Sequence, residues 1–168
     1  SGHRGWGEGL PYPRYGETVE EAVAAIEALP EGITRNALRQ AMKPGAARNA
    51  MDCALWDLEA KSSGKPVWQL AGLSLPRPVE IAFTLSLDTP DNMRAAAARN
   101  AQRAVLKVKL GTPADMPRIE AVRAGAPRAR LIVDANEGWT PEVYTDLAPY
   151  LIRLGVEMVE QLFPAGKD

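Results

Sequence analysis

Two lysines alternate with apolar residues in the sequence VLKVKL, which runs from Val105 to Leu110. Burying an ammonium group among apolar side chains is unfavourable unless a neighbouring group neutralises it or uses it. Residues i and i+2 of a β-strand project to the same side. We therefore expect Lys107 and Lys109 to share one face of a strand, and this face is either solvated or functional.

Polar residues recur near the ends of apolar segments at a regular spacing. Thr84 precedes Lys109 by 25 residues, and Asp134 follows Lys109 by 25. Glu160 follows Asp134 by 26 residues. In a (β/α)₈ barrel the active site lies at the carboxyl ends of the strands, where the βα loops gather. This spacing would bring two amines and two carboxylates to one cavity.

These groups suit the transfer of a proton next to a bound cation. Carboxylate oxygens such as those of Asp134 and Glu160 are ligands that Mg²⁺ prefers. Positive charge on Lys107 and on the metal favours the neutral amine of Lys109. A neutral amine can take a proton at neutral pH.

Structural interpretations compete with this chemistry. Two lysines on a strand are typical of a solvated sheet edge. Asp134 and Asn136 could form a turn, because Asp and Asn favour turns. Glu160 alone is typical of a surface charge at a strand end. The common spacing favours function, because it places all of these residues at one end of one sheet.

The first part of the chain has a helical pattern. Thr18 and Glu21 have the spacing of a capping box, which predicts a short helix. A longer helix is expected at about residues 46–61, and Cys53 on it is expected to be a small core residue. Residues 66–78 are rich in proline and predict a turn followed by a linker between domains.

Strands and helices alternate after this linker. The expected strands are 80–87, 104–110, 129–136 and 156–161, with helices near 90–103, 114–124 and 140–155. Pro149 in the last helix predicts a kink or an early break. This alternation predicts βα units with a parallel sheet. No glycine-rich phosphate loop follows the first strand, which argues against a nucleotide-binding fold.

Composition excludes several classes of partner. The 168 residues carry a net charge of −1, which provides no electrostatic attraction for nucleic acid or an anionic membrane. We find no apolar run long enough to span a bilayer and no secretory leader. One cysteine excludes an intramolecular disulfide and a thiolate metal site. We expect a cytoplasmic protein with no nucleic-acid and no membrane partner.

Three motifs resemble the enolase superfamily: KVKLG (107–111), DANEGW (134–139) and VEQLFP (159–164). Within it, the chain is similar to the muconate-lactonizing subgroup, which includes mandelate racemase and muconate cycloisomerase, and in that subgroup to the L-Ala-D/L-Glu dipeptide epimerases. GWGEGLP (5–11) and residues 47–73 resemble the capping domain of the same family. The resemblance covers nearly the whole chain.

The resemblance implies an α/β fold in two parts. Residues 1–75 would be the C-terminal, helical part of an α+β capping domain, and residues 76–168 would be the first four strands of a (β/α)₈ TIM-type barrel. The family's third metal ligand and opposing lysine lie on later strands. We therefore expect an incomplete portion of a longer enzyme that is inactive alone. Half a barrel leaves one strand edge unpaired and apolar surface uncovered.

The resemblance also implies a reaction. The proton α to a carboxylate of a dipeptide would be removed and returned through an enediolate, with Mg²⁺ as cofactor and a homo-oligomer as the complete enzyme. The implied roles are acid/base catalysis for Lys109, substrate binding and tuning for Lys107, metal binding for Asp134 and Glu160, support for Asn136, and pocket lining for Thr84.

Other functions remain open from the sequence. A muconate cycloisomerase or an o-succinylbenzoate synthase would belong to the same superfamily. A Schiff-base aldolase would use Lys109 or Lys107 as a nucleophile. A non-catalytic piece would act only by docking onto the missing half of the barrel.

Overall fold

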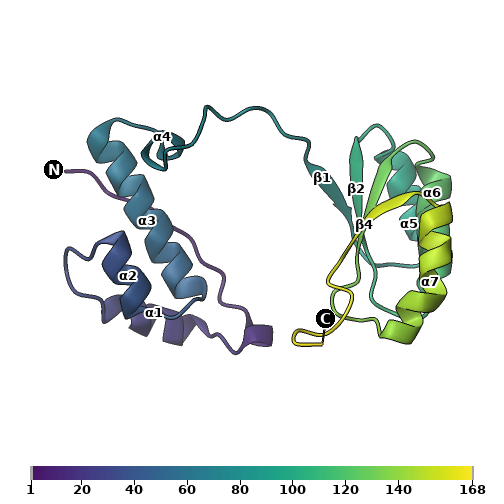
Figure 1. Cartoon of the computed structure of the whole chain (residues 1–168), viewed down its shortest axis with the longest axis horizontal. Coiled ribbons are helices and arrows are strands. Elements are labelled where there is room, and N and C mark those ends of the chain that lie inside the picture. The colour runs from purple at the N-terminus through teal and green to yellow at the C-terminus, as the bar shows by residue number, and fades with distance from the viewer. Residues whose placement is uncertain (1, 168) are drawn as a thin grey trace. The chain divides into compact units, whose positions relative to one another are not determined.

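The computed structural model describes residues 2–167 and separates into two compact units, Ser1–Arg77 and Pro78–Asp168 (Figure 1). The described part of the first unit is helical, whereas strands and helices alternate in the second. None of the described helices combines the length and the apolar character needed to cross a lipid bilayer.

Two helices in the first unit begin at threonine caps. Its elements are η1 (Pro13–Tyr15), α1 (Val19–Glu27), α2 (Arg35–Ala41), α3 (Ala46–Ser63) and α4 (Val67–Leu70). The hydroxyl oxygen of Thr18 accepts a hydrogen bond from the N–H of Glu21 at 3.2 Å, which confirms the predicted cap of α1. Thr34 caps α2 in the same way, although the sequence prediction does not include this helix.

An extended segment near the N-terminus packs directly against the backbone of α3. Gly5, Gly7 and Gly9 alternate along this segment, and a Cβ atom at any of them would overlap a carbonyl oxygen of α3. The oxygens belong to Ala54, Ala50 and Ala46, respectively. Two residues of extended chain span about 6.6 Å and four residues of helix about 6 Å, so the two small-residue patterns stay in step.

Replacing Gly7 by valine should destabilise the protein by about 1–3 kcal/mol, because the new side chain has no space above the α3 backbone. Chemical denaturation of the two proteins measures this difference. The neighbouring Glu8 is exposed, so Glu8→Ala is the matched control and should leave stability unchanged. Equal stability of Gly7→Val and Glu8→Ala would contradict the close approach.

The prediction that Cys53 is a core residue is wrong, because its side chain is exposed on α3. Successive residues of a helix point about 100° apart, as 3.6 residues make one turn. The extended segment covers the face of α3 that carries Ala50 and Ala54. Cys53 lies about 60° from Ala50 and about 100° from Ala54 around the helix, beside this contact, and its side chain remains exposed there.

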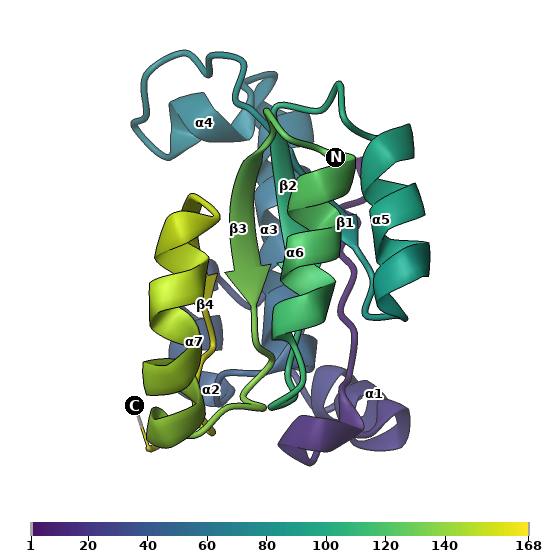
Figure 2. The ribbon, with the colours of Figure 1, turned by 90° about the vertical axis from the view of Figure 1, so that its right-hand side faces the viewer.

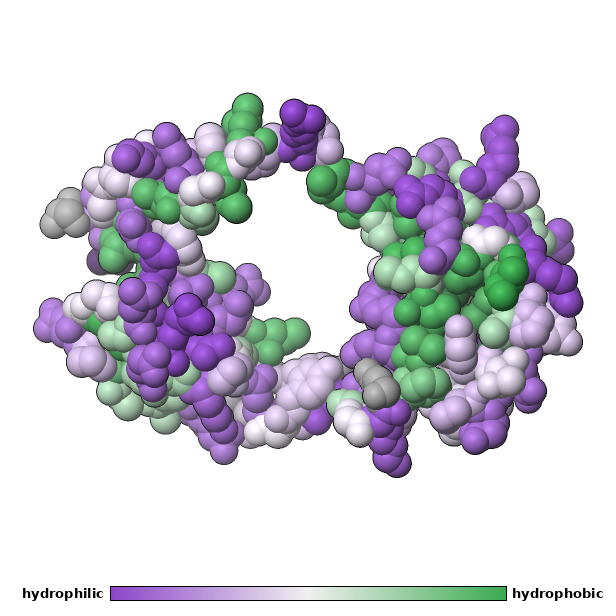
Figure 3. All heavy atoms as spheres, viewed as in Figure 1, coloured by the Kyte–Doolittle hydropathy of each residue, from purple (hydrophilic) through white to green (hydrophobic). Residues whose placement is uncertain are grey.

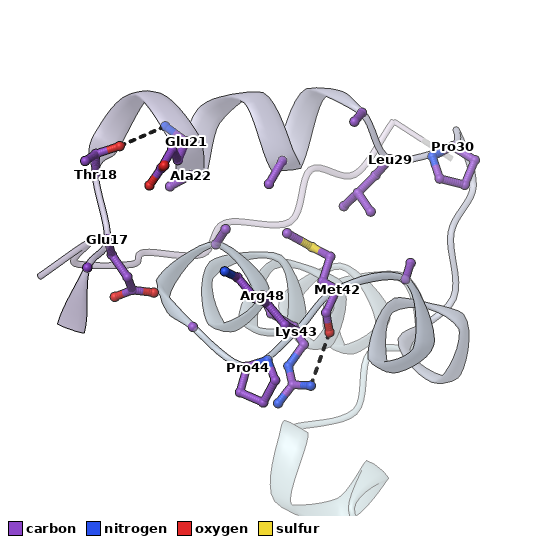
Figure 4. Close-up of a pocket in the computed structure, with 16 residues that line it drawn as sticks. Glu17, Thr18, Glu21, Ala22, Leu29, Pro30, Met42, Lys43, Pro44 and Arg48 are labelled. Atoms are coloured by element: carbon purple, nitrogen blue, oxygen red, sulfur yellow. Dashed lines mark hydrogen bonds between the residues drawn. The ribbon is translucent and has the colours of Figure 1, made fainter. Parts of the chain in front are cut away.

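A cavity of about 580 Å³ lies between α1 and the segment that joins α2 to α3 (Figure 4). Glu17 and Lys43 line it with charge, and Leu29 and Met42 line it with apolar surface. Arg48 donates a hydrogen bond to the carbonyl oxygen of Met42 at 3.3 Å. None of the residues that the sequence predicts for chemistry lines this cavity.

The second unit contains a parallel sheet with helices on one face (Figures 1 and 2). Its elements are β1 (Ala82–Leu85), α5 (Pro90–Arg99), β2 (Val105–Lys109), α6 (Met116–Gly125), β3 (Arg130–Asp134), α7 (Pro141–Arg153) and β4 (Val156–Glu160). The described strands lie in the order β1-β2-β3-β4 and all pair in parallel. The predicted α/β fold with a parallel sheet is confirmed.

Alternation along β2 decides which face of the sheet carries the lysines. Leu106 and Val108 are fully buried in the core, together with Ile119 and Val122 of α6. Side chains alternate between the two faces of a strand. The lysines at positions 107 and 109 therefore lie on the face opposite the helices, as their spacing predicts.

Helix α7 runs without interruption through Pro149 to Arg153, so the predicted early break does not occur. Leu147 and Leu151 lie on either side of the proline, and both are buried in the core. Proline has no backbone N–H, so the helix lacks one hydrogen bond at Pro149, and the burial of the two leucines offsets this loss.

Apolar side chains gather over β4 and α7, at the edge of the sheet that β4 forms (Figure 3). Within the described residues, β4 pairs with β3 on one side, and its other edge carries no strand. Met158 on β4 and Ile152 on α7 are exposed. The edge is therefore apolar and able to pair with a further strand.

Candidate active site

The register of the sheet places the predicted site residues in rows. Lys109 pairs with Asp134, and Asp134 pairs with Glu160, so the three residues lie side by side on adjacent strands. Thr84 on β1 pairs with Lys107, two residues before Lys109. Adjacent strands are about 4.8 Å apart, which lets the charged groups of one row meet.

The charged side chains form one connected cluster. The Nζ atom of Lys109 lies 2.7 Å from Oδ2 of Asp134, and Nζ of Lys107 lies 3.0 Å from the same oxygen. Lys107 also contacts Oε2 of Glu160 at 2.6 Å. Asp134 is 1% exposed, whereas the side chain of Glu160 is 38% exposed. The cluster is thus buried at Asp134 and open to solvent on its other side.

The ion pairs shift the pKa values of Lys107 and Asp134. The hydrogen bond to Glu160, and after it the one to Asp134, raises the pKa of Lys107 above its ordinary 10.5. Burial raises the pKa of Asp134, but hydrogen bonds from Lys109, Lys107 and the N–H of Asn136 outweigh it, so this pKa lies below its ordinary 3.8. Lys107 is therefore an ammonium group and Asp134 a carboxylate at neutral pH.

The depressed pKa of Asp134 predicts a loss of stability in acid. Its folded pKa lies below the unfolded value of 3.8, so its contribution is complete above that value and is lost as the pH falls through the folded pKa. With a chelator present, the unfolding temperatures of the unsubstituted protein and Asp134→Asn should differ most near neutral pH and converge in acid. A difference that does not change with pH would contradict this prediction.

The loop after β3 orients Asp134 through its backbone. The N–H of Asn136 donates to Oδ1 of Asp134 at 3.0 Å, and Asn136 Nδ2 lies 3.5 Å from Oε1 of Gln161. Asn136 and Gln161 both have positive φ angles, of 50° and 48°. Asparagine adopts this conformation more readily than most residues. Asn136 is a predicted site residue and Gln161 is not, because the position of Gln161 beside Asn136 depends on the β3–β4 register.

Thr84 occupies the predicted strand, at the position next to Lys107. It is exposed on β1. The register brings it beside the cluster, and its pocket-lining role stays a prediction.

The residues present fit part of a Mg²⁺ site. Asp134 and Glu160 offer oxygen atoms from adjacent strands, and both already bind one cation, the ammonium group of Lys107. Mg²⁺ is commonly held by one or two carboxylates together with water and substrate. Among the described residues, no group of three or more His, Cys, Asp or Glu side chains could hold a metal. Asp134 and Glu160 would thus be two ligands among several.

Asp115 is a buried carboxylate that is not among the predicted site residues. Asp115 is 0% exposed in the loop between β2 and α6, and it accepts hydrogen bonds from the N–H groups of Gly111 and Thr112 at 2.7 Å each. An aspartate directly before a helix is a common N-cap and is a signal that could have directed attention to it. In the structure it binds the preceding loop instead of the α6 backbone.

Family profiles match both units of the chain. The mandelate racemase / muconate lactonizing enzyme N-terminal domain matches residues 1–72, and the enolase C-terminal domain-like family matches residues 91–168. The chain belongs to the mandelate racemase / muconate lactonizing enzyme family. This membership confirms the resemblance inferred from the three motifs.

Members of this family with curated functions align along nearly all of the chain. The L-Ala-D/L-Glu epimerase of Escherichia coli K12 is 42% identical and covers 99% of this chain, which matches 54% of that enzyme. The N-acetyl-D-glutamate racemase of a Pseudoalteromonas species is 38% identical over 98% of this chain and 54% of its own length. The chain thus spans about half the length of these relatives.

Solved structures of family members have the same fold. An enolase family member from Agrobacterium tumefaciens with homology to dipeptide epimerases, bound to sodium and L-Ala-L-Glu, is 51% identical, with a TM-score of 0.92. The match covers 98% of this chain and 52% of that structure. The dipeptide epimerase of Cytophaga hutchinsonii, complexed with Mg and D-Ala-L-Val, is 26% identical, with a TM-score of 0.85 and coverage of 97% and 49%.

Proposed function

We propose that the protein containing this chain is a Mg²⁺-dependent epimerase that inverts the carbon α to a carboxylate in a dipeptide such as L-Ala-D/L-Glu. The observation that carries the proposal is the row formed by Lys109, Asp134 and Glu160 on three adjacent strands. The relatives named as L-Ala-D/L-Glu epimerases support the choice of substrate.

Lys109 would exchange the proton with the α-carbon of the substrate. Lys109 is the last residue of β2, and its side chain is 32% exposed, so a substrate can reach the Nζ atom. Lys107 would remain an ammonium group, because its pKa is raised by Glu160 and Asp134. A fixed positive charge suits it to hold the substrate carboxylate.

Asp134 and Glu160 would hold the metal ion. When bound, Mg²⁺ supplies positive charge that stabilises negative charge on the substrate carboxylate as the α-proton leaves. Asn136 would keep Oδ1 of Asp134 oriented through its backbone N–H. Thr84 would line the substrate pocket beside Lys107.

We infer that residues 1–75 belong to a capping domain and residues 76–168 to the first four strands of the barrel. The division of the structure after Arg77 supports this boundary. Among the described residues, Asp134 and Glu160 meet without a third carboxylate that could complete a metal site, and the chain spans about half the length of its relatives. We therefore propose that the 168 residues are inactive alone. A homo-oligomer and a cytoplasmic location stay predictions, to be checked by light scattering and by cell fractionation.

A second candidate is racemisation of an N-acylated amino acid. The N-acetyl-D-glutamate racemase at 38% identity favours it. N-acetyl-glutamate and an Ala-Glu dipeptide share a glutamate whose nitrogen carries an acyl group, so the same residues could act on both. The relative kcat/KM for the two substrates would decide between them.

A Schiff-base reaction is disfavoured at Lys107. Such a reaction needs a neutral amine as the nucleophile, whereas the raised pKa of Lys107 keeps it charged. Treatment with borohydride in the presence of a carbonyl substrate would trap a lysine adduct if this reaction occurred. We expect no adduct.

Proton exchange tests the proposed function directly. The protein containing this chain is mixed with L-Ala-L-Glu and Mg²⁺ in D₂O, and ¹H NMR follows the α-proton of glutamate. We expect loss of the α-proton signal together with formation of L-Ala-D-Glu, and a chelator should stop both. Epimerisation that persists in the chelator, or no exchange at all, would reject the proposal.

A further inference from the structure

Asp115 is a fully buried carboxylate that the proposed reaction does not use. Its Oδ2 atom accepts hydrogen bonds from the backbone N–H groups of Gly111 and Thr112 and from the indole N–H of Trp139, at 2.7, 2.7 and 2.9 Å. Its Oδ1 atom accepts from the Thr112 hydroxyl at 2.9 Å and from Arg118 Nη1 at 3.1 Å. These five donors satisfy a charge that would otherwise be costly to bury.

The donors come from two different βα loops. Gly111 follows Lys109 by two residues and Trp139 follows Asp134 by five, so one oxygen atom joins the ends of β2 and β3. Hydrogen bonds to an ionised carboxylate are stronger than neutral ones. The connection is therefore a strong link between the strand ends that carry Lys109 and Asp134.

The same two loops touch through their backbones. A Cβ atom at Gly138 would overlap the carbonyl oxygen of Gly111, so no side chain separates the loops at this point. The N–H of Leu110 donates to the carbonyl oxygen of Asp134 at 2.9 Å. A displacement of the loop after β2 would therefore also displace the loop after β3.

Arg118 extends the connection to a third loop. Its Nε donates to the carbonyl oxygen of Asp88, between β1 and α5, at 2.9 Å. Its Nη1 contacts Asp115 and the Thr112 hydroxyl. Loops after β1, β2 and β3 thus meet at the Asp115–Arg118 pair.

We propose that Asp115 is a positioning residue, which fixes the loops after β2 and β3 and thereby holds Lys109 against Asp134. The proposal rests on the proposed function, because it assigns Lys109 the proton transfer. The Lys109–Asp134 contact of 2.7 Å depends on both strand ends. A displacement of one loop would move the amine relative to the substrate, and errors of about 1 Å can lower a rate about 100-fold.

Three substitutions in the whole protein test the positioning role, and the two at Asp115 separate hydrogen bonding from charge. Asp115→Ala leaves three N–H groups without their acceptor, and we expect kcat to fall about 100-fold with a smaller change in KM. Asp115→Asn retains an oxygen for these donors and should recover most of kcat. Trp139→Phe removes the indole link alone and should give an intermediate kcat.

Arg123→Ala is the matched control at the opposite end of α6. Its guanidinium donates to the carbonyl oxygens of Leu154 and Ala129 at 2.8 and 2.7 Å, near the amino ends of the strands. We expect it to lower the unfolding temperature with no change in kcat. A folded Asp115→Ala protein with the kcat of Arg123→Ala, or Asp115→Asn as impaired as Asp115→Ala, would overturn the proposal.

NMR spectra of the same variants provide a second measurement that does not depend on enzyme activity. If the unsubstituted protein does not epimerise the dipeptide, the proposed function fails, but the amide resonance of Asn136 still reports the position of the loop after β3. Asp115→Ala should shift this resonance and move the Trp139 indole resonance, whereas Arg123→Ala should change neither. Unchanged resonances in Asp115→Ala would overturn the positioning role.

Discussion

Replacing Lys109 by methionine in the protein that contains this chain should lower kcat by about 100- to 10,000-fold, the usual contribution of a general acid–base group. Methionine retains much of the apolar stem but cannot carry a proton. Asp134 would still bind the ammonium group of Lys107 at 3.0 Å, so the buried carboxylate keeps a partner and the fold should persist. Steady-state kinetics in both reaction directions measure the effect, and circular dichroism checks folding.

Lys107→Met is the matched comparison, since it removes the other amine from the same strand face. It takes away the group that lies between Asp134 and Glu160, at 3.0 and 2.6 Å. We expect a larger increase in KM than Lys109→Met shows, because Lys107 would hold the substrate carboxylate. If Lys109→Met kept full activity, the assignment of proton transfer to Lys109 would be wrong.

Asp134→Asn should abolish Mg²⁺ binding measurable by calorimetry and with it the epimerase activity. An amide has no charge and is a weaker ligand for a hard cation than a carboxylate. In metal-free protein the same change should reduce stability by about 2 kcal/mol, because two charge-assisted hydrogen bonds from lysines lose their acceptor charge. The lysines are partly exposed and can turn to water, which limits the loss.

Asp146→Asn is the same chemical change at an exposed position of α7 and should affect neither Mg²⁺ binding nor stability. Glu160→Gln should also weaken Mg²⁺ binding, but with a smaller loss of stability, because Glu160 is more exposed than Asp134. Normal Mg²⁺ binding by Asp134→Asn would exclude this carboxylate as a metal ligand.

Periodicity was sufficient to predict the sheet. Alternation along VLKVKL predicts that both lysines share a face, and the buried positions of Leu106 and Val108 agree with it. The 25-residue spacing predicts the row of charged residues, because one βα unit returns the chain to the same level of the sheet. The strand ends are less well predicted: β1 is Ala82–Leu85, whereas the pattern extends over 80–87.

Local rules fail where a distant segment decides burial. Cys53 is apolar and lies on a helix, yet its side chain is exposed beside the contact that the glycine-rich segment makes with α3. Pro149 disfavours a helix locally, yet α7 continues through it, because Leu147 and Leu151 are buried against the sheet. In both cases tertiary packing outweighs the local preference.

The sequence alone determined the α/β class, the family and the identity of the residues in the charged row, since all three depend on residue types and their spacing. The tertiary structure decided which groups touch: that Lys107 lies between Asp134 and Glu160, and that Asp115 binds Trp139 across two loops. The physical reason is that periodicity reports which face of a strand is buried. A hydrogen bond between loops depends instead on atomic positions to within a fraction of an ångström, and these follow only from the packing of the whole unit.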